Sequence, residues 1–484
     1  MDTSVVWTVV AMMGVLVLVA VRNFNSWYYE PKLGPGRPPL PPGDMGWPIF
    51  GCMFDFLRAF NSPDPNSFTN HYICKYGRLG LYKTHLLGQP TILATTAETV
   101  RAVLLGDQQT IVSSWPTSMK VIMGDRSFAC VEGEEHRTLR KLTGTSVNGT
   151  PTLISYMPLI ESIAVDEFEN WAECGDINLL TNCKKFALHA IAGVMMSYQE
   201  GPETEDFANE FLGICGGIRS IAINLPGTSY HNSLKCRKKL VMRLLDVIEE
   251  RRRTEKKEHD VLQVLMDAKD EETGSTLTDM ECIDTILVYM IAGHESTAYT
   301  MLWYMILLHE NAHVLKKVRE ELQAIQAGKQ PDEPLSFSDY RKMMYLGHVI
   351  DEILRLMNLF PVVCRKANAD CVINGFTIPK GWSVESWLRT VHLDPKVYPD
   401  PLSFNPDRWN GLKVKPGTFM PFGGGYRLCP GKDFAKMEVS IILYHITLNY
   451  DWEPLNPKYK MKYLPHPCPT DGYPVRITRR ARVE

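Results

Sequence analysis

The sequence predicts a mainly α-helical protein with a minor β region, built as one large domain behind an N-terminal membrane anchor. Three observations predict this fold class. A run of 17 residues without charge, Val5–Val21, lies near the N-terminus. Short strand-like runs occur near Leu79–Tyr82 and Thr91–Ala94, whereas long helical patterns dominate after about Pro158. No second linker and no internal repeat follow the first 60 residues, so one domain is expected rather than several.

The composition excludes several classes of protein. Hydrophobic residues make up 45% of the 484 residues and charged residues 22%, which is ordinary for a globular protein and excludes a disordered or collagen-like chain. The formal net charge of -3 provides no basic field for nucleic acid. The 12 cysteines include no CxxC pair, so buried thiols in a reducing compartment are expected rather than disulfides. A chain this long can enclose a sizeable cofactor.

The apolar run near the N-terminus predicts a single-pass membrane anchor over residues 1–22. Val5–Val21 would span about 26 Å as a helix, the short end for a membrane span. A cleaved signal peptide is the alternative, but Asp2 stands where a basic residue is expected. Arg22, Lys32 and Arg37 follow the run, which predicts that the rest of the chain stays in the cytosol.

A proline-rich segment comes next. Pro38–Gly43 reads PPLPPG and is followed by Trp47-Pro48. Prolines this dense prevent a helix or a central strand, so residues 23–48 are expected to form a stiff linker. Residues 49–484 then form the globular domain.

One cysteine lies in an unusual loop. Pro421–Gly431 reads PFGGGYRLCPG, and a helical pattern follows it. Glycines allow a tight turn and a close approach to a flat group, and Arg427 suits a carboxylate. A thiolate at Cys429, close to a helix N-terminus, would suit axial binding of a metal. A glycine-rich turn with an ordinary buried cysteine is the alternative interpretation.

A second candidate site lies on a long apolar stretch, Cys282–Leu308. A second membrane span is possible by length, but His294 and Glu295 at its middle favour a buried core helix. Thr297 follows Gly293 by four residues, so its hydroxyl is expected to bond the carbonyl of residue 293. Glu295 and Thr297 together form a candidate pair for proton delivery. A polar cluster on an ordinary helix is the alternative.

The cysteine loop resembles a known family. It matches the pattern F-x-x-G-x-R-x-C-x-G at every fixed position, namely Phe422, Gly425, Arg427, Cys429 and Gly431. This pattern is similar to the haem-binding loop of the cytochrome P450 monooxygenases. The resemblance implies the cytochrome P450 fold and a haem b whose iron is bound by the thiolate of Cys429.

Further segments extend the resemblance. Glu295 and Thr297 resemble the oxygen-activation motif of the family, A-G-x-E-x-T. Glu352 and Arg355, three residues apart in the helical run Val349–Met357, resemble its structural E-x-x-R pair, for which Arg408 is the expected third member. A tryptophan, residue 409, follows where phenylalanine is usual.

The resemblance also implies residues that bind the haem propionates. Arg140 belongs to a segment similar to the family's W-x-x-x-R helix, with His136 replacing the tryptophan. Arg365 resembles a second propionate contact, and a surface arginine is the alternative for each. Family members of this kind use O₂ and electrons from NADPH–cytochrome P450 reductase, and they are anchored in the endoplasmic reticulum membrane with a cytosolic catalytic domain.

Several other segments resemble the plant ent-kaurenoic acid oxidases: Leu40–Pro48, Asn224–Gly227, Ile378–Trp382, Lys415–Phe419 and Tyr463–Pro467. This implies stepwise oxidation of ent-kaurenoic acid toward gibberellin A-twelve. Beta-amyrin 11-oxidases are close relatives that use triterpenes. The dipeptide Thr297-Ala298 resembles their sequence more than that of the ent-kaurenoic acid oxidases. The expected substrate pocket is mostly apolar and comprises Trp115, Ile291, Ala292, Phe360, Val362 and Val363.

Two other classes of function remain as alternatives. A haem-thiolate isomerase or dehydratase would need neither O₂ nor electrons, and Glu295 with Thr297 argues against it. A non-catalytic haem-binding or scaffold protein would not need a full set of oxygen-handling residues. Dependence on oxygen and reductant would separate the three classes.

Overall fold

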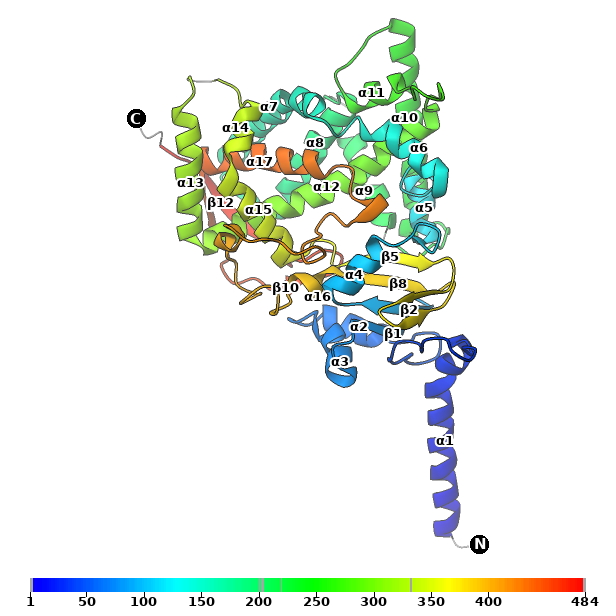
Figure 1. The fold of residues 1–484 in the computed structure, drawn as a ribbon. Helices are drawn as coiled ribbons and strands as arrows, with labels where there is room; N and C mark the ends of the chain where they lie inside the picture. The colour runs from blue at the N-terminus through cyan, green and yellow to red at the C-terminus, as the bar shows by residue number, and fades with distance from the viewer. Residues whose placement is uncertain (1–2, 200, 202–203, 219, 331–332, 482–484) are drawn as a thin grey trace.

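The computed structural model describes residues 3–481 apart from 200, 202–203, 219 and 331–332. Helices form most of the body, a five-stranded sheet lies along one side of it, and one long helix projects from the sheet side (Figure 1). This arrangement confirms the predicted mainly α fold with a minor β region.

The projecting helix is α1 (Thr3–Tyr29), and it contains the predicted apolar run. Its segment Val5–Tyr29 is apolar and long enough to cross a membrane, with a mean hydropathy of 2.3. The helix continues past residue 22, the expected end of the anchor, because no proline or glycine interrupts it between there and Tyr29.

The proline-rich segment lies against the body. The side-chain amide of Asn25, on α1, donates to the carbonyls of Met45 (2.9 Å) and Trp47 (2.6 Å). The amide of Lys83 donates to the carbonyl of Pro42 at 3.0 Å, and that of Thr377 donates to the carbonyl of Pro39 at 2.9 Å. The expected spacer is therefore attached to the sheet region at several points and is not a free linker.

The main sheet has the strand order β1-β2-β8-β5-β3 and is mixed, since β2 and β8 run parallel whereas the other pairs are antiparallel. The two strand-like runs of the sequence fall in β1 and β2. The strands of this sheet are β1 (Leu81–Leu86), β2 (Gln89–Ala94), β3 (Ile111–Ser113), β5 (Val362–Ala367) and β8 (Ser383–Trp387).

Three smaller sheets complete the β region within the residues that the structure describes. Their strands are β4 (Asp176–Asn178), β12 (Pro474–Arg479) and β9 (Tyr450–Pro454) in the first, β6 (Cys371–Ile373) and β7 (Phe376–Ile378) in the second, and β10 (Met461–Lys462) and β11 (Cys468–Pro469) in the third.

The helical body is built around α12 (Asp279–Glu310). This helix begins at a capping box in which Thr278 and Glu281 satisfy each other's backbone amides, and its apolar residues continue around the whole circumference. Such a helix must be covered on all sides, and α8 (Leu179–Met196), α15 (Met344–Met357) and α17 (Lys432–Asn449) pack against it. The predicted core helix is thus confirmed.

The other helices cover this core or the sheet. They are α2 (Met53–Phe60), α3 (Ser67–Tyr76), α4 (Ala97–Leu104), α5 (Thr117–Met123), α6 (Gly133–Gly144), α7 (Thr150–Cys174), α9 (Thr204–Ile218), α10 (Ser229–Thr254), α11 (Val261–Asp267), α13 (Ala312–Ala327), α14 (Phe337–Lys342) and α16 (Leu388–His392), with short 3₁₀ turns η1 (Pro406–Trp409) and η2 (Gly425–Arg427).

Candidate functional site

The cysteine loop is held by short backbone hydrogen bonds and leads directly into α17. The amide of Cys429 donates to the carbonyl of Phe422 at 3.0 Å, which closes the loop. Gly425 has φ 68°, and a Cβ atom there would lie 2.2 Å from the carbonyl oxygen of Leu104 at the end of α4. Glycine is therefore required at 425 by its positive φ and by the contact with α4. Gly431 has no such close neighbour.

The thiol of Cys429 is partly accessible although protein surrounds it. Its side chain keeps part of its surface accessible, and yet burial raises the pKa of the thiol, opposed by the backbone N–H of Gly431 and by the cation of Arg140. Cys364 on β5 has the same combination, an exposed side chain with a thiol pKa raised to about 12 by burial. From this combination we infer that both thiols border an internal space, called the hollow below, rather than the outer surface.

Three arginines gather at one side of this hollow. Arg427 forms an ion pair with Glu132 (2.7 Å), and Arg140 donates to the carbonyl of Leu428 at 2.7 Å. Arg365 on β5 is buried and donates to its own neighbour, the carbonyl of residue 364, at 3.0 Å. The predicted propionate contacts, Arg140 and Arg365, are thus brought to the same region as Arg427.

This cluster has more positive than negative charge. The buried Nε atoms of Arg365 and Arg427 have no hydrogen-bond partner among the described residues. Burial lowers the pKa of Arg365 and of Arg140, because each cation loses favourable contact with water. Unpaired buried guanidinium donors beside a thiol fit a group that carries carboxylates, and the two propionates of haem meet that requirement.

His136, which stands where the family has tryptophan, adds no charge to the cluster. It is buried, and its ring packs edge-on against Tyr426 with centroids 5.7 Å apart. Burial and the nearby cations of Arg427 and Arg140 lower its pKa to about 4. A neutral imidazole therefore replaces the indole as a packing group.

The hydroxyl groups of α12 do not lie as the sequence suggested. Thr297 donates to the carboxylate of Glu438 on α17 at 2.9 Å and is buried, so it does not bond the carbonyl of residue 293. Ser296 makes that kind of bond instead, to Ala292 O at 2.8 Å and more weakly to Gly293 O at 3.3 Å. Glu295 and Thr297 are two positions apart on α12, so they point about 200° apart around the helix and do not form the expected pair.

Gly293 has a packing role. A Cβ atom at this position would lie 2.9 Å from the side chain of Ile191, so the glycine allows α8 to pack closely against α12. The accessible residue on this turn is instead Ala292, which is exposed. His294 is buried beside α8, and burial lowers its pKa to about 4.

Glu295 is joined to a residue that the sequence did not connect with it. Its Oε2 atom lies 3.1 Å from Nε2 of His466, in the turn between β10 and β11. The other ring nitrogen of His466 lies 2.7 Å from the carbonyl oxygen of Leu359, just after α15. The ring of Phe360 packs edge-on against His466, with centroids 5.2 Å apart. This contact brings a predicted pocket residue beside the predicted acid.

The other predicted pocket residues lie in different places. Phe360 is 49% exposed, and Ile291 is partly buried one residue before Ala292. Val362 and Val363 are neighbours on β5, so the pleat directs them to opposite faces of the sheet, and they cannot line the same pocket wall. Trp115 donates to the carbonyl of residue 129, which also accepts from Arg427, so it lies beside the arginine cluster.

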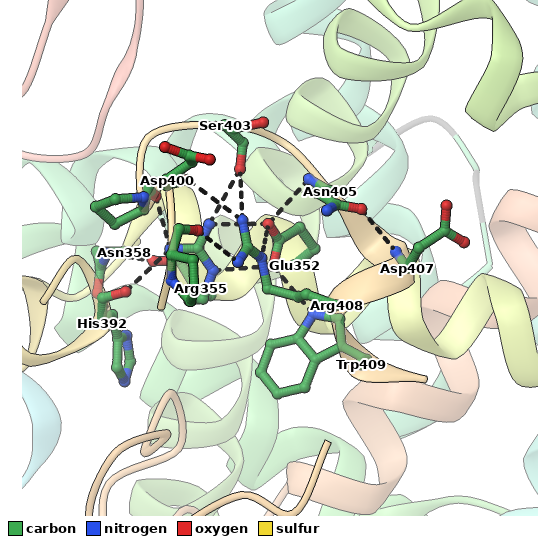
Figure 2. A network of polar contacts seen from close by, with 12 residues as sticks. Glu352, Arg355, Asn358, His392, Asp400, Ser403, Asn405, Asp407, Arg408 and Trp409 are labelled. Atoms are coloured by element: carbon green, nitrogen blue, oxygen red, sulfur yellow. Dashed lines mark hydrogen bonds and ion pairs between the residues drawn. The ribbon is translucent and has the colours of Figure 1, made fainter. Parts of the chain in front are cut away.

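The predicted E-x-x-R network is formed and extended (Figure 2). Glu352 and Arg355 are fully buried and joined by two hydrogen bonds of 2.8 and 2.9 Å. Arg408, the expected third member, donates to Glu352 at 2.9 Å. The indole N–H of Trp409 donates to the other oxygen of Glu352 at 3.0 Å, a bond that phenylalanine could not make. The network ties α15 to the segment that precedes the cysteine loop.

Glu438 is a residue of the site that sequence reasoning missed. It is buried in α17, and burial raises its pKa to about 7, opposed by the hydrogen bond from Thr297. An acidic residue between the apolar Met437 and Val439 was the signal that could have identified it. His466 was noticed only as part of a resembling segment, because its partner lies 171 positions away.

Comparisons with known proteins agree with this geometry. The family model described as cytochrome P450 matches residues 41–467. Ent-kaurenoic acid oxidase 2 of Arabidopsis thaliana is 42% identical over 98% of each chain, and beta-amyrin 11-oxidase of Glycyrrhiza uralensis is 38% identical over 95% of this chain and 94% of its own. A solved structure titled as the retinoic acid-bound cyanobacterial CYP120A1 superimposes with a TM-score of 0.82 at 28% identity, covering 92% of this chain and 100% of that one.

Proposed function

The chain belongs to the cytochrome P450 family, and from this premise we propose that it is a terpenoid oxidase whose substrate is ent-kaurenoic acid. As a cytochrome P450 it is a monooxygenase, an oxidoreductase with a haem bound through a cysteine thiolate. We further propose which residues bind the haem, which substrate is oxidised and where in the cell the protein lies.

Cys429 is the proposed thiolate ligand. The support is its place in the closed loop before α17, facing the hollow, with the Gly431 N–H and the Arg140 cation favouring its charged form. Arg140, Arg365 and Arg427 would hold the two propionates, in part through the Nε donors of the last two that have no partner among the described residues. When bound, the haem would supply the activation of O₂ and the insertion of one of its two oxygen atoms into a C–H bond, the other atom leaving as water.

The proposed proton path uses Glu295 and Ser296. Glu295 is an acid on the turn of α12 that exposes Ala292, and Ser296 is partly exposed beside it. The Ser296 hydroxyl donates to a helix carbonyl, so its oxygen keeps lone pairs that can accept a hydrogen bond from a molecule in the hollow. Thr297 has no such role in this proposal because its hydroxyl is committed to Glu438.

The substrate assignment is supported by relatives rather than by the pocket. Two ent-kaurenoic acid oxidases of Arabidopsis thaliana are 42% and 41% identical to this chain over at least 94% of each protein. Successive oxidations of ent-kaurenoic acid toward gibberellin A-twelve are therefore proposed. The apolar Phe360 and Ile291 suit a rigid hydrocarbon skeleton.

The proposed setting is the cytosolic side of the endoplasmic reticulum membrane. The apolar helix α1 would cross the membrane once, and basic residues such as Arg22 and Lys32 follow its apolar part. Electrons would come from NADPH–cytochrome P450 reductase, which is the type of redox partner that a P450 of this kind requires.

The test combines spectroscopy with product analysis of the full chain. The reduced carbon monoxide complex of the wild type should show the thiolate-type Soret band, and Cys429→Ala should lose it. Labelled ent-kaurenoic acid, supplied with NADPH and a plant reductase, should give hydroxylated and then further oxidised products. Retention of the thiolate band in Cys429→Ala would remove Cys429 from the assignment.

A triterpene is the second candidate substrate. The 38% identity to beta-amyrin 11-oxidase covers nearly the whole chain and is close to that of the kaurenoic oxidases. Turnover of beta-amyrin without turnover of ent-kaurenoic acid would favour this candidate and leave the monooxygenase assignment intact. Product formation without O₂ and NADPH would instead indicate a haem-thiolate isomerase.

A further inference from the structure

The contacts of His466 and Glu295 indicate how many protons the imidazole and the carboxyl group share. Nδ1 of His466 lies 2.7 Å from the carbonyl oxygen of Leu359, and a carbonyl can only accept a hydrogen bond. Nδ1 must therefore carry a proton. Nε2 of the same ring lies 3.1 Å from a carboxylate oxygen of Glu295.

A second proton must lie between Nε2 and the carboxylate. If Nε2 had none and Glu295 were ionised, two lone pairs would face each other at 3.1 Å in a site where the imidazole is 5% and the carboxylate side chain 14% exposed. The proton belongs either to the ring, giving an imidazolium–carboxylate pair, or to the acid, giving a neutral pair. In both arrangements the pair has no net charge and holds one proton that it can release.

The surroundings keep this pair in place. His466 is 4% exposed, and its ring packs against Tyr299 (4.8 Å) and Phe360 (5.2 Å between centroids). The imidazole therefore has little freedom to turn away. Glu295 stands one residue before Ser296, the partly exposed hydroxyl of the proposed proton path.

We propose that His466 is a positioning residue that keeps a releasable proton on Glu295 for the oxidation reaction. The proton leaves through the Glu295 carboxyl group toward the hollow, which leaves an anionic pair. The pair then takes one proton back from water, so that protons balance and no electrons are exchanged. This inference rests on the proposed monooxygenase function, but not on the identity of the substrate.

The first test detects the protons directly in the wild-type full-length holoprotein. With ¹⁵N-labelled histidine, the Nδ1 resonance of His466, assigned by its loss in His466→Phe, should be that of a protonated nitrogen at neutral pH. A resonance of an unprotonated Nδ1 would overturn the proposal. This measurement needs no substrate, so it stands apart from the test of the proposed function.

The second test measures how much of the NADPH that is consumed leads to product and how much to hydrogen peroxide. His466→Phe keeps an aromatic ring against Tyr299 and Phe360 but removes both nitrogens. Glu295→Gln keeps a hydrogen-bond donor for Nε2 but has no proton to release. Both variants should retain the thiolate-type spectrum and substrate binding, while hydrogen peroxide released per NADPH rises several-fold and product falls correspondingly.

A matched control separates this effect from general damage. His445 on α17 forms a second histidine–glutamate contact, with Glu161 on α7, also at 3.1 Å. His445→Phe should leave the ratio of product to NADPH at the wild-type value. Unchanged coupling in both His466→Phe and Glu295→Gln would overturn the proposal. If His466→Phe does not fold, the ratio of product to NADPH in Glu295→Gln decides the outcome.

Discussion

At the scale of single residues, Ser296 and Thr297 show that two adjacent hydroxyl groups on one helix can have different partners and exposure. The two hydroxyls are adjacent in sequence, but Ser296 bonds its own helix and is partly exposed, whereas Thr297 is buried against α17. A rotation of about 100° per residue accounts for the difference. Only the first hydroxyl is accessible to a bound molecule.

We therefore expect Ser296→Ala and Thr297→Val to differ in kind. Ser296→Ala should increase the NADPH that is consumed without product, because a hydrogen-bonding oxygen beside Glu295 is lost. Thr297→Val should lower the free energy of unfolding by about 1–3 kcal/mol, because buried Glu438 loses its donor. Product per NADPH and urea unfolding measure the two effects. The reverse result would restore Thr297 to the proton path.

Glu438 provides a prediction about pH. Burial raises its pKa in the folded protein from 4.5 to about 7, so the folded state binds this proton more tightly than the unfolded state. The resulting stabilisation is complete below about pH 4.5 and is lost as the pH rises through about 7. Glu438→Gln should remove this dependence, which amounts to at most about 3 kcal/mol.

Urea unfolding at several pH values between about 4.5 and about 7 would check the predicted pH dependence of Glu438. The difference in stability between the wild type and Glu438→Gln should change with pH. The exposed glutamate of β9, Glu453, provides the control, and Glu453→Gln should follow the wild type at every pH. Parallel curves for the wild type and Glu438→Gln would contradict the prediction.

At the scale of elements, the network around Glu352 joins α15 to η1 and to the loop before the cysteine. Its carboxylate accepts hydrogen bonds from Arg355, Arg408 and Trp409 and from the backbone N–H of Asn405. A fully buried carboxylate is stable only when its lone pairs are satisfied, so each donor holds its segment in place. The network thus fixes the approach to the cysteine loop.

Removing the indole donor tests this view. Trp409→Phe should lower the free energy of unfolding by about 1–3 kcal/mol, because a buried charged group loses one hydrogen bond. It should also weaken haem retention, since the segment leading to the cysteine loop is loosened. Trp382→Phe is the matched control: Trp382 is 4% exposed, and its indole makes no hydrogen bond within the described residues. Equal effects of the two substitutions would contradict the role of the N–H.

At the scale of the whole molecule, α1 serves both as a candidate anchor and as a part of the body. Its N-terminal part projects from the sheet side, whereas Asn25 is buried and Tyr29 packs against His85 with centroids 5.0 Å apart (Figure 1). Arg22 forms an ion pair with Asp44 at 2.5 Å. The boundary between anchor and body therefore lies within one helix.

Two truncations should separate these roles. Removing residues 1–20 should release most of the protein from membranes and leave the unfolding temperature unchanged. Removing residues 1–29 should also lower the stability, because the two hydrogen bonds of Asn25 and the packing of Tyr29 are lost. Membrane fractionation and thermal unfolding measure the two effects. Protease protection of the body in sealed microsomes would contradict a cytosolic domain.

The sequence by itself determined the features that depend on neighbours along the chain. The apolar run of α1, the all-round apolar pattern of α12 and the spacing within the Phe422–Gly431 loop are local, so the order of residues alone is enough to recognise them. The contact of Arg408 with Glu352 was also anticipated, because the resemblance supplied what spacing could not.

Only the tertiary structure decided which side chains meet. The directions of Ser296 and Thr297 depend on the rotation of α12 relative to α17, and the partner of Glu295 comes from a turn near the C-terminus. Val362 and Val363 were separated by the pleat of β5. Such contacts depend on how distant segments pack, and no pattern within one segment contains that information.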